Sequence, residues 1–199
     1  MKVIKKLSSG LGIAAIIIVF LIPFYIMFYL SLSGAGSSFA EEWFPRALNF
    51  ENFANAWKAA NMGRAMRNSF IITGGAVVVL IFCAASGGYA AARSKSKINR
   101  IIFNVMILSM MVPGIINTVP LYSIMKRING INTHWAMILL LACQSLPFSV
   151  FLYEGFISSM SESIEEAAII DGCSRFAAFW KVTFPLLKPI TATVVIMQG

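Results

Sequence analysis

Four long stretches without a single Asp, Glu, Lys or Arg dominate this chain of 199 residues. They cover residues 7–32, 68–92, 101–125 and 134–153. Each stretch is long enough to cross a bilayer as a helix, which takes about 20 apolar residues. Because lipid offers the backbone no hydrogen-bond partners, a single segment that crosses it in this way must be helical. The sequence therefore predicts an all-α, polytopic membrane helix bundle.

The composition supports this interpretation. Hydrophobic residues make up 58% of the chain and charged residues only 12%, whereas soluble domains carry about 25% charged residues. The net charge of +8 would suggest a nucleic-acid partner in a soluble protein. Here the basic residues lie between the apolar stretches, as is typical of the flanks of membrane spans. We therefore expect membrane lipid and no nucleic acid as a partner.

The first stretch has two possible interpretations. Lys2, Lys5 and Lys6 precede an apolar run, and residues 38–40 could form a cleavage site, which is the outline of a signal peptide. The run 11–32 exceeds the core of about 7–15 residues that signal peptides have. This length favours an uncleaved first helix.

The distribution of positive charge predicts the orientation. The loop 93–100 carries four basic residues and no acid, and with the N-terminus inside, 10 of the 16 Lys and Arg residues lie in the cytoplasm. The segment 33–67 is then an external loop and 154–188 an internal one. From residue 189 the chain is apolar again for 11 residues, which we interpret as a partial fifth span in a chain truncated within that helix.

Small and polar residues inside the spans suggest packing and a pathway. Ala84, Gly88 and Ala92 recur at intervals of four, a spacing that lets helix backbones approach closely. Asn117 in the third stretch and Gln144 in the fourth lie near prolines, which favour a broken helix of the kind that lines a pathway or a site. Hydrogen bonding between helices, which would also involve Asn104, explains the same polar residues equally well.

The internal loop predicts two short helices. Ser163 and Glu166 fit a capping box at the start of the first helix, and Gly172 ends it. Helical spacing places four residues of this helix on one face, namely Ile164, Ala167, Ala168 and Asp171.

The second helix of the loop carries an aromatic stripe. Phe176, Phe179 and Trp180 share a face, and Pro185 and Pro189 are expected to end the helix. Such a stripe can lie at the lipid interface or in a partner's groove, and it can also pack under the spans of its own chain.

The motifs of this loop resemble those of a known family. They are EEAAIIDG at 165–172, Phe179 and FPLLKP at 184–189. Further matches, in order, are GYAAAR at 88–93, MVPG at 111–114, VPLYSIM at 119–125, NGINTHWAMIL at 129–139 and LPF at 146–148. Together they resemble the permease subunits of ABC importers, more narrowly the carbohydrate-uptake branch and the second permease subunit of maltose-type systems. Where many relatives have a proline before the loop helix, this chain has Ser161, which is a good N-cap.

The resemblance implies a function. A single transmembrane domain, 1–199, would form half of the pathway of an ATP-driven sugar importer in a bacterial or archaeal inner membrane. Its partners would be a second permease subunit in a heterodimer, two cytoplasmic ATPase subunits and an extracytoplasmic solute-binding protein. The positions implied for ATPase coupling are Glu165, Glu166, Ala167, Ala168, Asp171 and Gly172. A sugar site needs polar side chains and aromatic faces inside the pathway, so the resemblance makes Asn117, Tyr122 and Gln144 the candidates for the substrate pathway.

Other functions find less support in the sequence. We expect no catalytic residue, metal ligand or cofactor, because no nucleophile elbow, metalloprotease or phosphate-loop motif is present, and the three cysteines Cys83, Cys143 and Cys173 are scattered. An ion-coupled secondary transporter would need inverted repeats or charges inside the spans. A non-transporting membrane assembly subunit is the remaining alternative.

Overall fold

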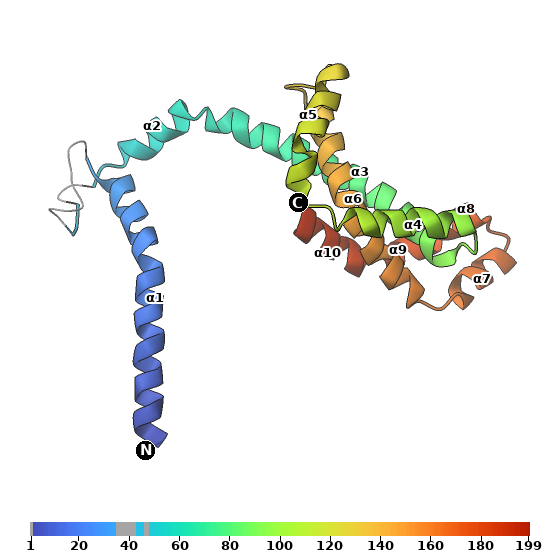
Figure 1. The fold of residues 1–199 in the computed structure, drawn as a ribbon, viewed down its shortest axis with the longest axis horizontal. Helices are drawn as coiled ribbons and strands as arrows, with labels where there is room; N and C mark the ends of the chain where they lie inside the picture. Colours follow the sequence, from blue (N-terminus) through green and yellow to red (C-terminus); the bar gives the residue numbers. More distant parts are fainter. Residues whose placement is uncertain (1, 35–42, 46–47) are drawn as a thin grey trace. The chain divides into compact units, whose positions relative to one another are not determined.

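The computed structural model describes residues 2–34, 43–45 and 48–199, and every regular element among them is helical. This confirms the predicted all-α class for the described part of the chain. The possible cleavage site at 38–40 lies outside the described residues. The chain divides into two compact units, residues 1–66 and 67–199, which are described separately below (Figure 1).

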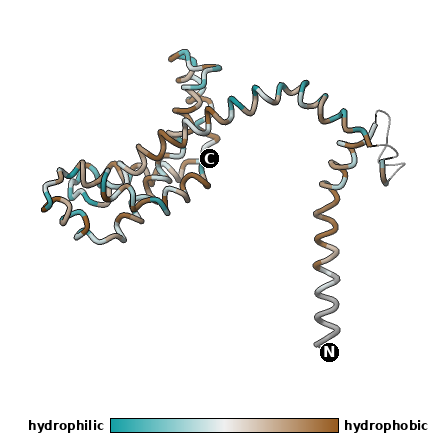
Figure 2. Tube along the Cα trace, turned by 180° about the vertical axis from the view of Figure 1, so that it is seen from behind, coloured by the Kyte–Doolittle hydropathy of each residue, from teal (hydrophilic) through white to brown (hydrophobic). Residues whose placement is uncertain are grey.

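The first unit contains the helix α1 (Lys2–Leu32), which continues through Pro23, and the short helix α2 (Glu51–Ala59). The segment Gly12–Leu32 is long and apolar enough to cross a membrane. Large apolar side chains such as Ile18, Phe20 and Phe24 are exposed along it, and Figure 2 shows its hydrophobic character. In lipid these exposed side chains would lie in their preferred solvent.

The connection from α1 to α2 is fixed by hydrogen bonds to the end of α1. The side-chain amide of Asn52 donates to the carbonyls of Ser31 and Ser33, at 3.1 and 2.8 Å. The backbone N–H of Asn49 donates to the carbonyl of Leu32 at 2.8 Å. These donors satisfy carbonyls that the end of a helix leaves without partners.

The second unit holds the rest of the chain, beginning within α3 (Met62–Arg93). The elements that follow are α4 (Lys97–Ser109), the 3₁₀ turn η1 (Gly114–Asn117), α5 (Thr118–Arg127), α6 (His134–Ser158), α7 (Ser163–Ile170), α8 (Arg175–Ala178), the π-helical stretch η2 (Phe179–Thr183), α9 (Phe184–Leu186) and α10 (Lys188–Gln198). Among the described residues, three helices could each cross a membrane, or up to five segments if each of two bent pairs counts as one span.

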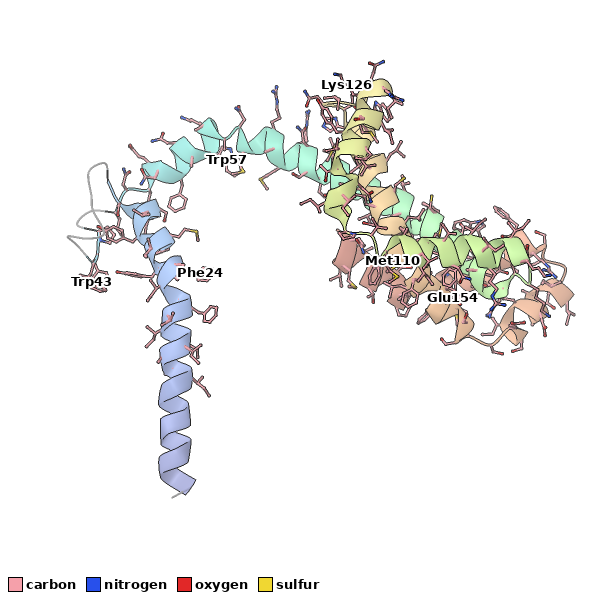
Figure 3. The ribbon with its side chains drawn as sticks, in the orientation of Figure 1. Phe24, Trp43, Trp57, Met110, Lys126 and Glu154 are labelled. Carbon is pink, nitrogen blue, oxygen red and sulfur yellow. The ribbon has the colours of Figure 1, made fainter. Side chains whose placement is uncertain are left out.

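The third apolar stretch, 101–125, is a broken helix rather than a straight one. The helix α4 ends at Ser109, and the following pair η1 and α5 is bent from it by 100°. The break precedes Pro113, and a proline disfavours helical geometry in the residue before it. Pro120 lies in the first turn of α5, where the backbone N–H that proline lacks has no partner in the helix anyway. Met110 lies at this joint, and Lys126 lies near the other end of α5 (Figure 3).

The expectation that Pro185 ends a helix was wrong. The helical path runs from Arg175 to Leu186 without a break, and the bend of 70° comes at Leu187, before α10. Pro185 follows the π-helical stretch η2, in which the backbone hydrogen bonds already depart from the α-helical pattern, so its missing N–H is tolerated. The aromatic helix does end just before Pro189, as expected, and Pro189 lies in the first turn of α10, where proline is favoured.

The core of the second unit forms where α3 packs closely against α6. Ala84 and Ala85 of α3 are fully buried, as are Val150 and Tyr153 of α6. A Cβ atom at Gly88 would lie only 2.5 Å from the Cβ of Tyr153 and 2.9 Å from the backbone nitrogen of Glu154. The prediction that small residues allow close helix packing is therefore confirmed at Ala84 and Gly88. The other core residues are Leu80, Ala142, Ile157, Phe179, Leu187 and Val194.

Replacing Gly88 by leucine should separate α3 from α6. No space exists for the new side chain at the backbone of Tyr153 and Glu154, and overpacking costs about 1–3 kcal/mol. The matched control is Gly74→Leu on the same helix, because a Cβ at Gly74 meets nothing within 4 Å. Thermal unfolding of the full-length protein in mild detergent should show a lower Tm for Gly88→Leu only, and equal Tm values for both variants would contradict this packing.

Candidate functional site

The first helix of the internal loop, α7, follows a turn at Ser161, two residues before the serine that the sequence suggested as its cap. The hydroxyl of Ser161 accepts a hydrogen bond from the backbone N–H of Ser163 at 3.3 Å and lies 2.7 Å from the hydroxyl of Ser163. Ser163 is itself the first helical residue. The expected capping box between Ser163 and Glu166 is therefore wrong. Ser161 is not the N-cap either, because Glu162 occupies that position and its side chain makes no capping hydrogen bond. The Ser161 hydroxyl instead holds the turn just before the helix.

The end of α7 is a tight glycine turn. Gly172 has a φ of +90°, in the region that residues with a side chain rarely adopt. Its N–H donates to the carbonyl of Ile169 and the N–H of Cys173 donates to the carbonyl of Ala168, both at 3.0 Å. This pair of bonds is a Schellman motif, which satisfies the last carbonyls of the helix. The next helix starts at once, because the hydroxyl of Ser174 accepts from the N–H of Ala177.

The buried face of α7 carries a charge. Glu165 accepts a hydrogen bond from the Tyr89 hydroxyl at 2.9 Å and from Nε of Arg93 at 3.1 Å, one on each carboxylate oxygen. Arg93 also donates to the carbonyl of Met160 at 3.1 Å. The exposed fractions of the Arg93 and Glu165 side chains are only 11% and 10%. Removing one partner of such a buried pair typically costs about 3–5 kcal/mol, because the other charge stays behind without a partner.

No motif in the sequence identifies the pair of Arg93 and Glu165. Tyr89 and Arg93 stand four residues apart on α3, so they share a helix face, and that spacing was the only local signal. Their partner Glu165 is 72 positions from Arg93. Glu162 lies 3.7 Å from Arg93 but is mostly exposed, so it adds little.

The other residues that were predicted to take part in ATPase coupling differ in how exposed they are. Ala168 is buried beside Glu165, whereas Glu166, Ala167, Asp171 and Gly172 are exposed. Of the four residues that helical spacing places on one face, Ala168 is therefore buried, whereas Ile164, Ala167 and Asp171 are exposed.

An exposed surface remains on the outer side of this loop, which we call the loop surface. It consists of Glu166, Ala167, Ile170, Asp171, Gly172 and Phe176. Two of its side chains are large, apolar and largely exposed, with exposed fractions of 85% for Ile170 and 75% for Phe176. Apolar side chains exposed next to acids, in a loop outside the apolar spans, are typical of an interaction surface.

The aromatic stripe packs mainly under the chain's own helices. Phe179 is buried against Tyr89 of α3, and the centroids of the two rings are 4.6 Å apart. The ring centroid of Trp180 lies 5.5 Å from that of Phe82, which is also in α3. Of the three interpretations, packing under the chain's own spans is confirmed for Phe179 and Trp180. Phe176 instead contributes to the loop surface.

The three candidate pathway residues line two adjoining hollows beside the bend of the third stretch. The larger hollow, of about 840 Å³, is lined by Asn117 and Gln144, and the smaller, of about 290 Å³, by Tyr122 and Gln144. Five residues line both: Gly114, Leu121, Met125, Leu140 and Gln144. Asn104, by contrast, is exposed and is not among the residues that line these hollows.

Comparison with known proteins identifies the family of this arrangement. Residues 84–199 match the family of binding-protein-dependent transport system inner membrane components. The chain belongs to this family. The matched region contains the end of α3, the bent pair with its hollows, and the whole loop with Arg93, Glu165 and Gly172.

Individual relatives are sugar permeases. The chain is 38% identical over 179 residues to the melibiose/raffinose/stachyose import permease protein MelC of Bacillus subtilis, covering 89% of this chain and 64% of that protein. It is 33% identical over 154 residues to the diacetylchitobiose uptake system permease protein NgcG of Streptomyces coelicolor, covering 77% and 51%. The chain thus spans about half to two thirds of the length of these relatives.

A solved structure shows the same fold. A chain of a bacterial ABC transporter involved in the import of the acidic polysaccharide alginate superimposes with a TM-score of 0.80. The match covers 98% of this chain and 69% of that one, at 22% identity. The helix bundle predicted from the four apolar stretches is therefore the fold of an ABC importer chain.

Replacing Gly172 by alanine should loosen the end of α7. A side chain in left-handed geometry costs about 1–2 kcal/mol, and relief of that strain breaks the hydrogen bonds of Gly172 and Cys173. Hydrogen exchange of the full-length protein in detergent should be faster over residues 168–173. Gly155→Ala is the control, because the φ of Gly155 does not lie in the left-handed range and a Cβ atom there would meet nothing within 4 Å. Unchanged exchange in Gly172→Ala would contradict the role of the turn.

Proposed function

We propose that this chain is a permease subunit of an ATP-driven, binding-protein-dependent sugar importer. In this proposal residues 1–199 belong to one transmembrane domain that forms half of the translocation pathway. The observation that carries the proposal is the family match over 84–199, which joins the helix bundle and the loop in one unit. The relatives named above, which are import permeases for oligosaccharides, support the substrate class.

The loop surface is the proposed docking site for an ATPase subunit. Ile170 and Phe176 offer apolar contacts, and Glu166 and Asp171 offer negative charge beside them. Buried apolar anchors rimmed by charge are the usual composition of a protein interface. The complementary partner is a groove with an apolar floor and basic rim on a cytoplasmic ATPase. The Gly172 turn holds the two sides of the surface at a fixed angle.

The contacts of Arg93 support the proposed orientation. Arg93 ends α3 and is the first of the four basic residues of the loop 93–100, and it donates to the carbonyl of Met160 just after α6. The basic loop and the docking loop therefore lie on the same side of the bundle. Positive charge favours the cytoplasm, so the proposal assigns α7 to the cytoplasmic face, where an ATPase is available. The basic residues near the N-terminus favour the same side for the N-terminus.

The two hollows are the proposed segment of the sugar pathway. They lie at the bend between α4 and α5, where broken helices commonly line a site. Asn117, Tyr122 and Gln144 supply the amide and hydroxyl groups that could hydrogen-bond sugar hydroxyls, on walls that are otherwise mostly apolar. The proposal includes a second permease subunit, forming a heterodimer, two ATPase subunits, and an extracytoplasmic solute-binding protein that delivers the sugar.

Uptake of labelled sugars tests this function. The full-length subunit, expressed with its genomic neighbours in a strain that lacks oligosaccharide import, should take up at least one of melibiose, raffinose and diacetylchitobiose, and uptake should stop when cellular ATP is depleted. Gln144→Leu should lower uptake about tenfold or more, since sugar groups left without a partner cost about 1–3 kcal/mol.

The matched control for this experiment is Asn104→Leu. Asn104 is also a polar residue within a span, but it lies outside the two hollows, so uptake should stay near the wild-type level. Uptake that is driven by an ion gradient and is insensitive to ATP would instead indicate a secondary transporter. Equal effects of the two substitutions would contradict the assignment of the pathway.

A further inference from the structure

The pair of Glu165 and Arg93 is not part of the loop surface. The side chain of Glu165 is buried and points away from the loop surface. Both of its carboxylate oxygens accept hydrogen bonds from other residues of the chain. Its neighbour Glu166 is exposed and free for an ATPase. Two adjacent glutamates on one short helix therefore face in different directions, and the inward one needs a separate explanation.

The geometry of Glu165 fixes α7 to α3 at two points. Tyr89 holds one oxygen and Arg93 the other, and these two residues are one helical turn apart on α3. Contacts to both oxygens prevent the carboxylate from rotating, so α7 cannot turn about its own axis without breaking a buried bond. The same guanidinium holds the carbonyl of Met160, directly before α7.

The contacts continue from α3 into two further helices. One residue before Tyr89, Gly88 lies against the backbone of Tyr153 and Glu154 in α6, with no room for a side chain between them. The hydroxyl of Tyr153 donates to the hydroxyl of Thr191 in α10 at 2.9 Å. These contacts connect α7 through α3 to α6 and α10. The helix α6 also carries Gln144 and Cys143 on the wall of the larger hollow.

We propose that Glu165 is a positioning residue that transmits movement of the docking helix to the pathway. Through Arg93 and Tyr89 it makes α7 and α3 move as one body, so that closure of the ATPase subunits against α7 changes the shape of the hollows beside α6. This inference rests on the proposed function. Glu165 touches neither the ATPase nor the sugar in this scheme, and its effect is on the link between ATP hydrolysis and movement of the bundle.

Labelling of Cys143 measures this link without knowledge of the sugar. Cys143 is exposed and lines the larger hollow, so its reactivity with N-ethylmaleimide reports on that wall. The full-length subunit, with Cys83 and Cys173 changed to serine, is reconstituted in vesicles together with the partner permease and the ATPase. The rate of Cys143 labelling is measured with and without ATP and vanadate, and ATP hydrolysis is measured in parallel.

The expected result separates transmission from docking. In the wild type, ATP with vanadate should change the labelling rate. In Glu165→Gln the ATPase should still co-purify and hydrolyse ATP, while the response of Cys143 to ATP falls about tenfold, within the range of about 5- to 150-fold that is common for coupled sites. The charge swap Arg93→Glu with Glu165→Arg should restore part of the response. Glu162→Gln, which changes an exposed glutamate near the same arginine, should leave the response unchanged.

Three results would overturn the proposal. A normal response of Cys143 in Glu165→Gln would show that the pair does not transmit movement, and the proposed function would stand. Loss of the ATPase from Glu165→Gln without rescue by the charge swap would give Glu165 a merely structural role. A wild-type complex in which ATP does not affect Cys143 would contradict the assigned pathway, and the transmission proposal would fail with it.

Discussion

The second unit depends on the close approach of α3 and α6 at Gly88. Inside a membrane, apolar contact with another helix gains little over contact with lipid, so helices associate through close packing of their surfaces. Gly88 provides that packing, because its missing side chain lets the backbone at Tyr153 and Glu154 come within contact distance. The fully buried alanines Ala84 and Ala85 extend the contact along α3.

The functional elements are attached to this contact in a definite order. Just beyond Gly88, Tyr89 and Arg93 hold Glu165, and with it the loop helix α7. On the other side, α6 carries part of the wall of the hollows. A loop that would meet a cytoplasmic partner and a wall that would meet a sugar are therefore joined through the same pair of helices. In our proposal this arrangement lets an ATPase outside the membrane act on a pathway inside it.

The sequence predicted what depends on local pattern. Long runs without charge locate the helices that could span a membrane, because only a helix lets a single segment satisfy its own backbone in lipid. The spacing of Ala84 and Gly88 identified the packing face, and Gly172 identified the turn. The bend near Pro113 also has a local cause, although its angle does not follow from one residue.

Other features depend on contacts that no local pattern reveals. The pairing of Arg93 with Glu165 spans 72 positions, so the inward direction of Glu165 could not be read from α7 alone. The start of α7 at Ser163, with Glu162 in the N-cap position, does not follow from the sequence, because serine is a good N-cap and two serines stand at this point of the chain. The helix that continues past Pro185 does so through a π-helical stretch, and burial of Phe179 in the core accompanies that change.

Affinity purification of the full-length subunit from mild detergent, with mass spectrometry of the proteins that co-purify, tests the central claim most directly. The account predicts a second permease and a soluble ATPase with a phosphate-binding loop, with the ATPase lost when residues 162–183 are replaced by a Gly/Ser linker. Recovery of the well-folded wild-type subunit alone, or of an ATPase that stays bound without this loop, would contradict it.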